Sequence, residues 1–192
     1  MTAVLGIFVG GESRRMGSPK GLLRRGGVSL VERWLALATE LGVEARLVGR
    51  RPEYAAWAEL TLDDAPAGIG PLGGLRALLL HARGRPALTF ACDMPHVTIA
   101  LAERLLSAPD AIAVAATRGG RWEPFCARWD AARALPAVDA RIARGATSLT
   151  GLLDDVGAVP LELSADERAQ VHDWDTPADV DDPAAARSLG DD

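Results

Sequence analysis

The chain has 192 residues, of which 48% are hydrophobic and 24% charged, and its formal net charge at pH 7 is −5. This composition excludes an intrinsically disordered chain, and the negative charge argues against general affinity for nucleic acid. The two cysteines, Cys92 and Cys126, are too few for a disulfide framework, and there is no secretory signal pattern. No apolar run approaches the ~20 residues of a membrane span. We therefore expect a cytoplasmic globular protein that binds neither nucleic acid nor membrane.

Predicted strands and helices alternate along the chain. Strands are predicted over residues 3–9, 44–48, 60–62, 86–91, 112–117, 122–129 and 159–163. Helices are predicted over residues 29–41, 52–59, 71–82, 98–107, 130–144 and 147–154. The alternation predicts a Rossmann-like, three-layer α/β/α fold with a mostly parallel sheet, to which the turn at residues 118–121 adds an antiparallel pair. We expect a single domain over residues 1–181 and a frayed tail over residues 182–192.

The loop after the first predicted strand has the sequence VGGESRRMGSPK and is rich in glycine and cations. No acidic residue occurs between Ser13 and Val31, where five cations fall. Glycines let backbone amides approach a ligand, and cations such as Arg15 and Lys20 can neutralise a polyphosphate. The order of residues does not fit a Walker A loop, which ends in Gly-Lys-Ser/Thr. The sequence predicts another kind of phosphate loop, with a solvated basic face as the alternative.

A second loop, DDAPAGIG, leads into the helix predicted to begin at Pro71. Gly68, Gly70 and Gly73 form a literal GxGxxG, which raises a dinucleotide-binding alternative. The distance of these glycines from the preceding strand counts against it. A tight turn into a helix start, with backbone amides facing a ligand, fits better. Asp64 is then either a turn carboxylate or a group that binds a sugar or base.

Aspartates follow the buried strand at residues 86–91 and recur near the end of the chain. Asp93, in ACDMP, projects from a strand end, where ligands of open α/β sheets bind, or else caps a turn. Mg²⁺ prefers one or two carboxylates together with waters and phosphates, so Asp93 is a metal candidate. In DWDTPAD, a helix start at Thr176 leaves Asp173 and Asp175 unexplained. Each is a second carboxylate for the metal or a turn cap.

These loops together resemble one family. FVGGESRRMGSPK is similar to the LAGGxSxRMGxxK signature of nucleotidyltransferases, and DDAPAGIGPLGG and ACDMP look like that family's aspartate-bearing loops. WEPFCARW is similar to its substrate-side strand, and DWDTPAD to its C-terminal motif. The five segments occur in order and span nearly the whole chain. The spellings are most similar to the MobA-like, molybdenum cofactor guanylyltransferase family, whose fold is the nucleotide-diphospho-sugar transferase type.

The resemblance implies roles for residues at matching positions. It implies catalytic roles for Arg15, Lys20 and Asp93, and Mg²⁺ on Asp93 with Asp175 as a second candidate. The nucleotide-binding residues that it implies are Phe8, Val9, Gly10, Gly11, Ser13, Lys20, Asp64, Gly70, Pro71, Leu72, Gly73 and Asp93. Two departures concern the choice of base: Arg50 stands near a usual asparagine, and aspartates at 173 and 175 are commoner among cytidylyl relatives.

The implied reaction is transfer of GMP from GTP to molybdopterin, with release of pyrophosphate. The resemblance thus implies GTP and molybdopterin as the substrates. It also implies transient contact with other molybdenum cofactor biosynthesis proteins. The alternatives are cytidylyl transfer to the same cofactor, nucleotidyl transfer to a sugar phosphate, and a non-catalytic nucleotide-binding module. The intact Lys20 and Asp93 argue against the last of these.

Overall fold

A seven-stranded mixed sheet forms the centre of the molecule. The computed structural model describes residues 2–10 and 19–174. The strands are β1 (Val4–Phe8), β4 (Glu44–Val48), β5 (Thr61–Leu62), β6 (Pro86–Ala91), β7 (Ala113–Arg118), β8 (Arg121–Asp130) and β9 (Val159–Glu162). They lie in the order β5-β4-β1-β6-β8-β7-β9. Within this sheet β8 alone runs against its neighbours, so the predicted parallel sheet with an antiparallel addition is confirmed.

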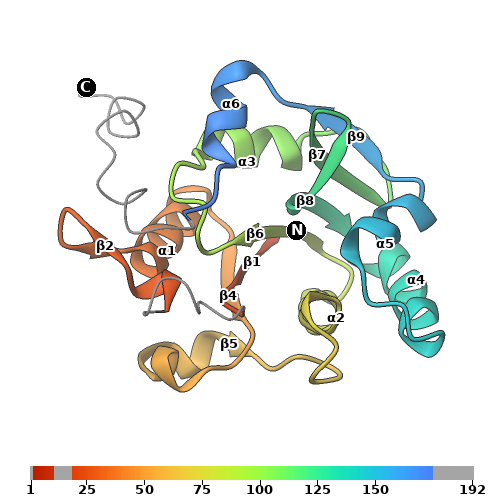
Figure 1. Cartoon of the computed structure of the whole chain (residues 1–192), viewed down its shortest axis with the longest axis horizontal. Coiled ribbons are helices and arrows are strands. Elements are labelled where there is room, and N and C mark those ends of the chain that lie inside the picture. Colours follow the sequence, from red (N-terminus) through yellow and green to blue (C-terminus); the bar gives the residue numbers. More distant parts are fainter. Residues whose placement is uncertain (1, 11–18, 175–192) are drawn as a thin grey trace.

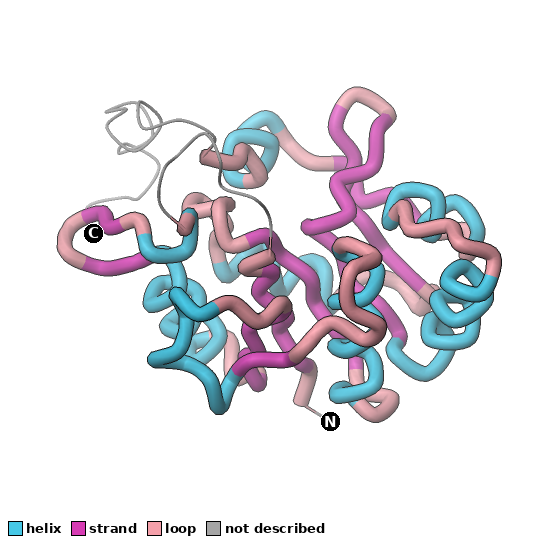
Figure 2. The backbone as a smooth tube through the Cα atoms, turned by 60° about the horizontal axis from the view of Figure 1, so that its bottom comes forward, coloured by secondary structure: helices cyan, strands magenta, loops and turns pink. Residues whose placement is uncertain are grey.

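Helices cover both faces of the sheet, as Figures 1 and 2 show. The α-helices are α1 (Leu30–Glu40), α2 (Pro71–Ala82), α3 (Ile99–Leu106), α4 (Ala131–Ala143), α5 (Leu149–Asp155) and α6 (Ala165–Gln170). Buried side chains of α1 and α3 belong to one core cluster, and those of α2, α4 and α5 to the other. The three-layer α/β/α prediction is therefore confirmed. None of the helices in the described ranges is both long enough and apolar enough to cross a membrane.

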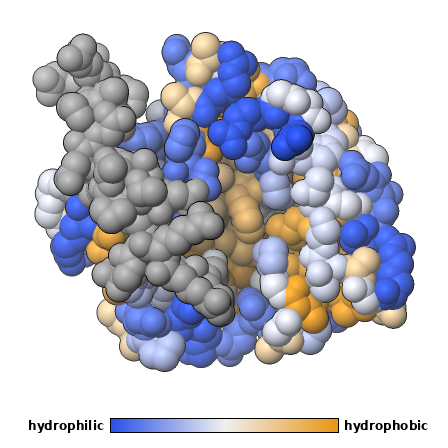
Figure 3. All heavy atoms as spheres, viewed as in Figure 1, coloured by the Kyte–Doolittle hydropathy of each residue, from blue (hydrophilic) through white to orange (hydrophobic). Residues whose placement is uncertain are grey.

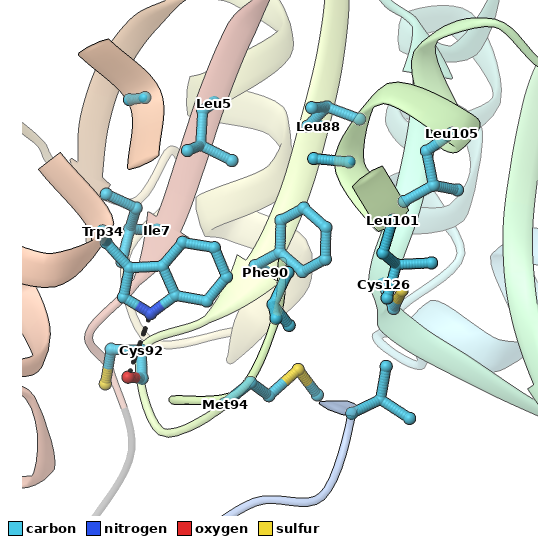
Figure 4. Close-up of a cluster of buried hydrophobic side chains, with 14 of the residues drawn as sticks. Leu5, Ile7, Trp34, Leu88, Phe90, Cys92, Met94, Leu101, Leu105 and Cys126 are labelled. Carbon is cyan, nitrogen blue, oxygen red and sulfur yellow. Dashed lines mark hydrogen bonds between the residues drawn. The ribbon is translucent and has the colours of Figure 1, made fainter. Parts of the chain in front are cut away.

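Strand β1 shows how one short segment serves both cores. Its side chains alternate, with Leu5 and Ile7 in the cluster under α1 and α3 (Figure 4), and Val4 and Phe8 in the cluster under α2. All five residues of β1 are buried, as expected for a central strand between two helical layers. A Cβ atom at Gly6 would lie 2.4 Å from Leu78 Cδ2, so glycine allows α2 to pack closely on the sheet.

Three segments differ from the predicted elements. Residues Pro52–Leu60 form a kinked 3₁₀ segment, η2, with non-helical dihedral angles at Tyr54 and Trp57. A small hairpin, β2 (Arg24–Arg25) and β3 (Val28–Ser29), turns through Gly26 and Gly27, both at positive φ. Helix α6 was missed although Ser164 and Glu167 form a capping box at its start. The predicted helix start at Thr176 and the tail at residues 182–192 lie outside the described residues.

Both cysteines lie inside the core and are free thiols. Burial raises the pKa of the Cys92 thiol to about 12, and it also raises the pKa of the Cys126 thiol. A thiol with a raised pKa forms little of the reactive thiolate at neutral pH. Both residues therefore serve packing.

A charged cluster joins the start of β4 to the end of α2. The Glu44 carboxylate lies 2.6 Å from Arg46, 2.7 Å from His81 and 2.5 Å from Arg85. Burial acts to raise the pKa of Glu44, but hydrogen bonds from His81 and Arg85 and the charge of Arg46 outweigh it and lower the pKa to about 2. The ordinary value is 4.5, so the folded state favours the ionised carboxylate.

We predict that Glu44→Gln lowers stability near neutral pH and that its difference from the wild type shrinks in acid. A group whose pKa is lowered by folding stabilises the folded state above its unfolded pKa. For Glu44 this contribution is lost as the pH falls from about 4.5 toward about 2. Urea titrations at pH 6, 4 and 3 measure the difference. Glu103→Gln, at an exposed position of α3, is the matched control, and its stability difference from the wild type should not shrink in acid in the same way. A constant difference for Glu44→Gln across this range would contradict the prediction.

Candidate active site

A cavity of about 290 Å³ opens where β1 and β6 end. Figure 3, drawn in the view of Figure 1, shows this face hollowed near its centre over a hydrophobic floor. Strands β1 and β6 are parallel neighbours, with Phe8 opposite Ala91, so the loops that follow them start side by side. One wall consists of predicted site residues from these loops: Phe8, Val9, Gly10, Lys20 and Asp93.

An ion pair between Lys20 and Asp93 links the two loops across this wall. Lys20 Nζ donates a hydrogen bond of 2.8 Å to Asp93 Oδ2. The two side chains are only 18% and 16% exposed, so water screens the attraction less than at an open surface. Lys20 is also the only lysine among the 21 lysines and arginines of the chain. A compact ammonium group therefore stands where the loops after β1 and β6 meet.

The Tyr54 side chain forms a hydrogen bond with the backbone next to Lys20. Lys20 begins η1 (Lys20–Leu22), and the buried Gly21 N–H donates a hydrogen bond of 3.1 Å to Tyr54 Oη. A Cβ atom at Gly21 would lie 2.9 Å from that oxygen and 3.0 Å from Val31 Cγ2, so the segment fits only with glycine there. Burial raises the pKa of the Tyr54 hydroxyl, which therefore stays protonated. Tyr54 is thus a support for the lysine that the sequence did not reveal.

The loop that carries Asp93 is held by hydrogen bonds to its main chain. The Cys92 N–H donates to Phe8 O at 3.0 Å, and Trp34 Nε1 donates to Cys92 O at 3.1 Å, as Figure 4 shows. The Trp174 N–H donates to Asp93 O at 2.9 Å. The backbone of Cys92 and Asp93 is therefore bonded to three separate parts of the chain, two through Cys92 and one through Asp93, and this limits how far the Asp93 carboxylate can move.

Asp64 lies next to this wall, among glycines. A Cβ atom at Gly74 would lie 3.1 Å from Asp64 Oδ1, and one at Gly49 would lie 3.3 Å from Gly10 Cα. Gly49 also has a φ of +97°, which a side chain would strain. Burial raises the pKa of the Asp64 carboxyl, and the charge of Asp63 raises it further, while Arg51 opposes the shift. A half-buried carboxyl thus lies close to the backbone that follows β1.

The predicted loop before α2 packs under Asp64. A Cβ atom at Gly73 would lie 2.3 Å from Pro66 O and 3.4 Å from Asp64 Cβ. Gly70 is the N-cap of α2 with a φ of +70°, and Pro71 is the first residue of the helix, as predicted. Asp64 and residues 70–73 do not line the cavity of about 290 Å³, but the contacts through Gly49 join them to its edge.

The opposite wall comes from the antiparallel pair β7 and β8. It contains Arg118, at the end of β7, with Glu123 and Phe125 of β8. Arg118 Nε donates a hydrogen bond of 2.7 Å to Glu123 Oε1. The ring of Phe125 lies 5.1 Å from that of Phe8, so this wall touches the end of β1. The sequence predicted the turn between these strands, and residues 122–129 resemble a substrate-side strand, but nothing in the sequence pointed to Arg118.

The carboxylates of the cavity suit a magnesium ion. Asp93 and Asp173 both line it, and Mg²⁺ commonly takes one or two protein carboxylates and completes its shell with waters and phosphate oxygens. Within residues 2–10 and 19–174, no three His, Cys, Asp or Glu side chains group as a metal site.

Some of the predicted residues lie outside the described part of the chain, namely Gly11, Ser13, Arg15 and Asp175. Among the others, one wall of the cavity is formed by Phe8, Val9, Gly10, Lys20 and Asp93. Arg50, where the choice of base was in question, forms an ion pair with Asp63. Tyr54, Arg118 and Glu123 were missed because only the folded chain brings them to the site.

Comparison with known proteins agrees with the resemblance seen in the sequence. A family model described as the MobA-like NTP transferase domain matches residues 5–156. The chain is 34% identical to the molybdenum cofactor guanylyltransferases of Xanthomonas euvesicatoria pv. vesicatoria and Rhodobacter capsulatus. These matches cover 89% and 91% of this chain and 88% and 90% of those relatives.

A solved structure shares the fold. Molybdopterin-guanine dinucleotide biosynthesis protein A from Archaeoglobus fulgidus superposes with a TM-score of 0.78 at 22% identity. The match covers 96% of this chain and 97% of that one. At this identity the likeness concerns the fold alone, and it extends over nearly the whole of both chains.

We predict that Tyr54→Phe lowers the free energy of unfolding by ~1–3 kcal/mol, because it leaves the buried Gly21 N–H without its acceptor. Denaturant titration measures the change. Thr61→Val is the matched control: it also removes one hydroxyl from the η2 region, but its partner there is the Trp57 carbonyl oxygen rather than a buried donor. Thr61→Val should lower the free energy of unfolding by less than Tyr54→Phe does. Equal stabilities of Tyr54→Phe and wild type would contradict the prediction.

Proposed function

Because the chain belongs to the MobA-like NTP transferase domain family, we propose that it is a molybdenum cofactor guanylyltransferase, which transfers GMP from GTP to molybdopterin and releases pyrophosphate. The observation that carries the proposal is the Lys20–Asp93 ion pair on the wall of the strand-end cavity. It offers a cation for phosphates and a carboxylate for a metal side by side. Relatives of the same name at 34% identity over most of both chains support the choice of reaction.

In the proposed reaction an oxygen of the acceptor's terminal phosphate forms a bond to the α-phosphorus of GTP. The bond between that phosphorus and the bridging oxygen to the β-phosphorus breaks, and its electron pair leaves with pyrophosphate. This chemistry needs little covalent participation by the protein, so positioning and charge neutralisation dominate. Lys20 and the backbone amides of the glycine-rich loop after β1 neutralise charge on the leaving group.

Further roles are part of the proposal. We assign Arg15, in the loop outside the described residues, to charge neutralisation together with Lys20. Asp64 and the start of α2 then hold the nucleoside, because Asp64 lies beside Gly49 near Gly10, and Gly73 of α2 lies beside Asp64. The remaining nucleotide contacts in the proposal are Gly11, Ser13, Gly70, Pro71, Leu72 and Gly73.

The proposed metal is Mg²⁺, held by Asp93, with Asp175 as a second candidate ligand. When bound, Mg²⁺ neutralises phosphate charge and aligns the phosphate oxygens. Asp93 is suited to hold it because three main-chain hydrogen bonds fix its loop. The chain's own contribution is the fixed carboxylate and the ammonium group beside it. The proposal also includes transient contact with proteins that deliver molybdopterin or receive the product.

The proposal is tested by incubating the protein with Mg²⁺, molybdopterin and each labelled nucleoside triphosphate in turn. Formation of the dinucleotide and pyrophosphate with GTP supports it. Product with CTP would move the reaction to the cytidylyl branch, for which the aspartates at 173 and 175 are the sequence argument. Transfer to a sugar phosphate in place of molybdopterin would overturn the proposed acceptor, and absence of any product would overturn the proposed activity.

We predict that Lys20→Met and Asp93→Asn each lower turnover by ~10²- to 10³-fold, the usual cost of losing one group that stabilises charge in the transition state. The Arg76–Asp139 ion pair between α2 and α4, 2.6 Å long, supplies the matched controls. Arg76→Met and Asp139→Asn make equivalent changes away from the cavity and should retain turnover. Near-full turnover in a folded Lys20→Met or Asp93→Asn variant would refute the assigned roles.

A binding measurement follows from the single lysine. Labelling lysine with ¹³C at Cε gives one side-chain resonance, which belongs to Lys20. We predict that GTP with Mg²⁺ shifts this resonance in a saturable way, because phosphates approach the ammonium group. The shift should saturate at the GTP concentrations at which calorimetry shows binding. Saturating GTP that binds by calorimetry but leaves the resonance unmoved would exclude contact with Lys20.

A further inference from the structure

The two walls of the cavity each carry a cation with a carboxylate partner. On the first wall Lys20 pairs with Asp93, and on the second Arg118 pairs with Glu123 at 2.7 Å. Among the described residues that line the cavity, these are the two cations. The proposed function uses the first wall for the nucleotide. It assigns no role to Arg118, the cation on the second wall.

Arg118 is positioned by the β7–β8 hairpin. Gly119 and Gly120, both at positive φ, make the two-residue turn after it, so that Arg118 pairs with Arg121 in the hairpin. On strand β8, residues 124–126 lie between the pairs Ala116–Glu123 and Ala115–Ala127, which forms a bulge. Bulges re-aim side chains and are common beside active sites. Here the bulge brings Glu123 and Phe125 to the cavity.

The bulge is held from the neighbouring strand. The buried hydroxyl of Thr89, on β6, donates a hydrogen bond of 3.2 Å to Pro124 O. The indole N–H of Trp129 donates in turn to Thr89 Oγ1 at 3.2 Å. The second wall is therefore tied to β6, the strand that ends two residues before Asp93.

The partner of Arg118 leaves much of its guanidinium group available for a ligand. The bond to Glu123 uses Nε, whereas the group has five N–H donors in a planar fork that matches phosphate. The Arg118 side chain is 44% exposed, while that of Glu123 is 17% exposed. Glu123 thus fixes the guanidinium from the protein side and leaves it open to the cavity.

Nucleotidyl transfer places two charged groups on opposite sides of the α-phosphorus, because the attacking and leaving oxygens lie roughly in line. Lys20 belongs to the leaving side in the proposed function, so an attacking phosphate needs its own cation on the other side. We propose that Arg118 binds the terminal phosphate of the acceptor and that Glu123 is a positioning residue that orients Arg118. This inference rests on the proposed function.

Arg118→Gln tests it with steady-state kinetics on the full chain, using molybdopterin and GTP. We expect the KM for molybdopterin to rise about 10- to 100-fold, the usual effect of losing a charge-assisted hydrogen bond. The KM for GTP should change less than about twofold, as should GTP affinity by calorimetry, because Lys20 and Asp93 are untouched. Arg118→Lys should recover part of the loss, since it restores the charge but not the fork.

Arg121→Gln is the matched control. It makes the same change on the same hairpin, opposite Arg118, at an exposed position that does not line the cavity. An Arg121→Gln enzyme with the kinetics of Arg118→Gln would show a general charge effect and overturn the assignment. An unchanged KM for molybdopterin in Arg118→Gln would also overturn it, as would an equal rise in the KM for GTP.

Failure of this inference and failure of the proposed function give different results. A wild type that transfers GMP, with an Arg118→Gln variant that matches it, leaves the function intact and removes the role of Arg118. A wild type that transfers no GMP removes the proposed function. Calorimetric binding of molybdopterin then decides the role of Arg118: weaker binding by Arg118→Gln than by the wild type supports the phosphate contact, and equal binding overturns it.

Discussion

The parallel pairing of β1 with β6 is the constraint on which the site depends. Because Phe8 lies opposite Ala91, the loops that follow the two strands leave the sheet together, and Lys20 reaches Asp93 at 2.8 Å. Parallel neighbours with both faces buried need helical crossovers, which explains why nearly every residue of β1 is committed to one core or the other. The same burial that fixes the strands also removes water from around the ion pair, so that the charges meet in a partly shielded place.

The reversal of β8 gives the site its second wall. In a wholly parallel sheet, every strand would send its loop to the same edge, and no strand interior would face the cavity. Since β8 returns toward β6, its bulge lies beside the loops after β1 and β6, and Phe125 meets Phe8. An open parallel sheet supplies nucleotide-binding loops in many enzymes. In the proposed reaction, the antiparallel addition supplies a separate surface for the second substrate.

Most of the fold could be predicted from the sequence because the patterns that mark helix and strand boundaries involve residues close together in the chain. The capping box of Ser29 with Glu32 and the proline that starts α2 mark helix boundaries within a few residues. The 3₁₀ segment at Pro52–Leu60 could not be read in this way, since its kink follows from Tyr54 turning inward to Gly21, a contact 33 residues away in sequence. Motifs likewise pointed to Lys20 and Asp93, but Arg118 lies at the end of a hairpin and Glu123 lies beside a bulge whose register no local pattern encodes. The roles of all these residues stay predictions.

The two cations of the cavity differ in kind, and the difference fits the work proposed for each. An ammonium group is a compact point charge with no preferred plane, so Lys20 can share the phosphates of a nucleotide with a metal held on the adjacent Asp93. A guanidinium group presents a rigid fork, which suits a single terminal phosphate held in one orientation for attack. In a chain whose other 20 lysine-or-arginine positions are all arginine, the single lysine stands beside the carboxylate proposed to hold the metal. Each cation is held by a carboxylate before substrate arrives, so little reorganisation remains for the reaction itself.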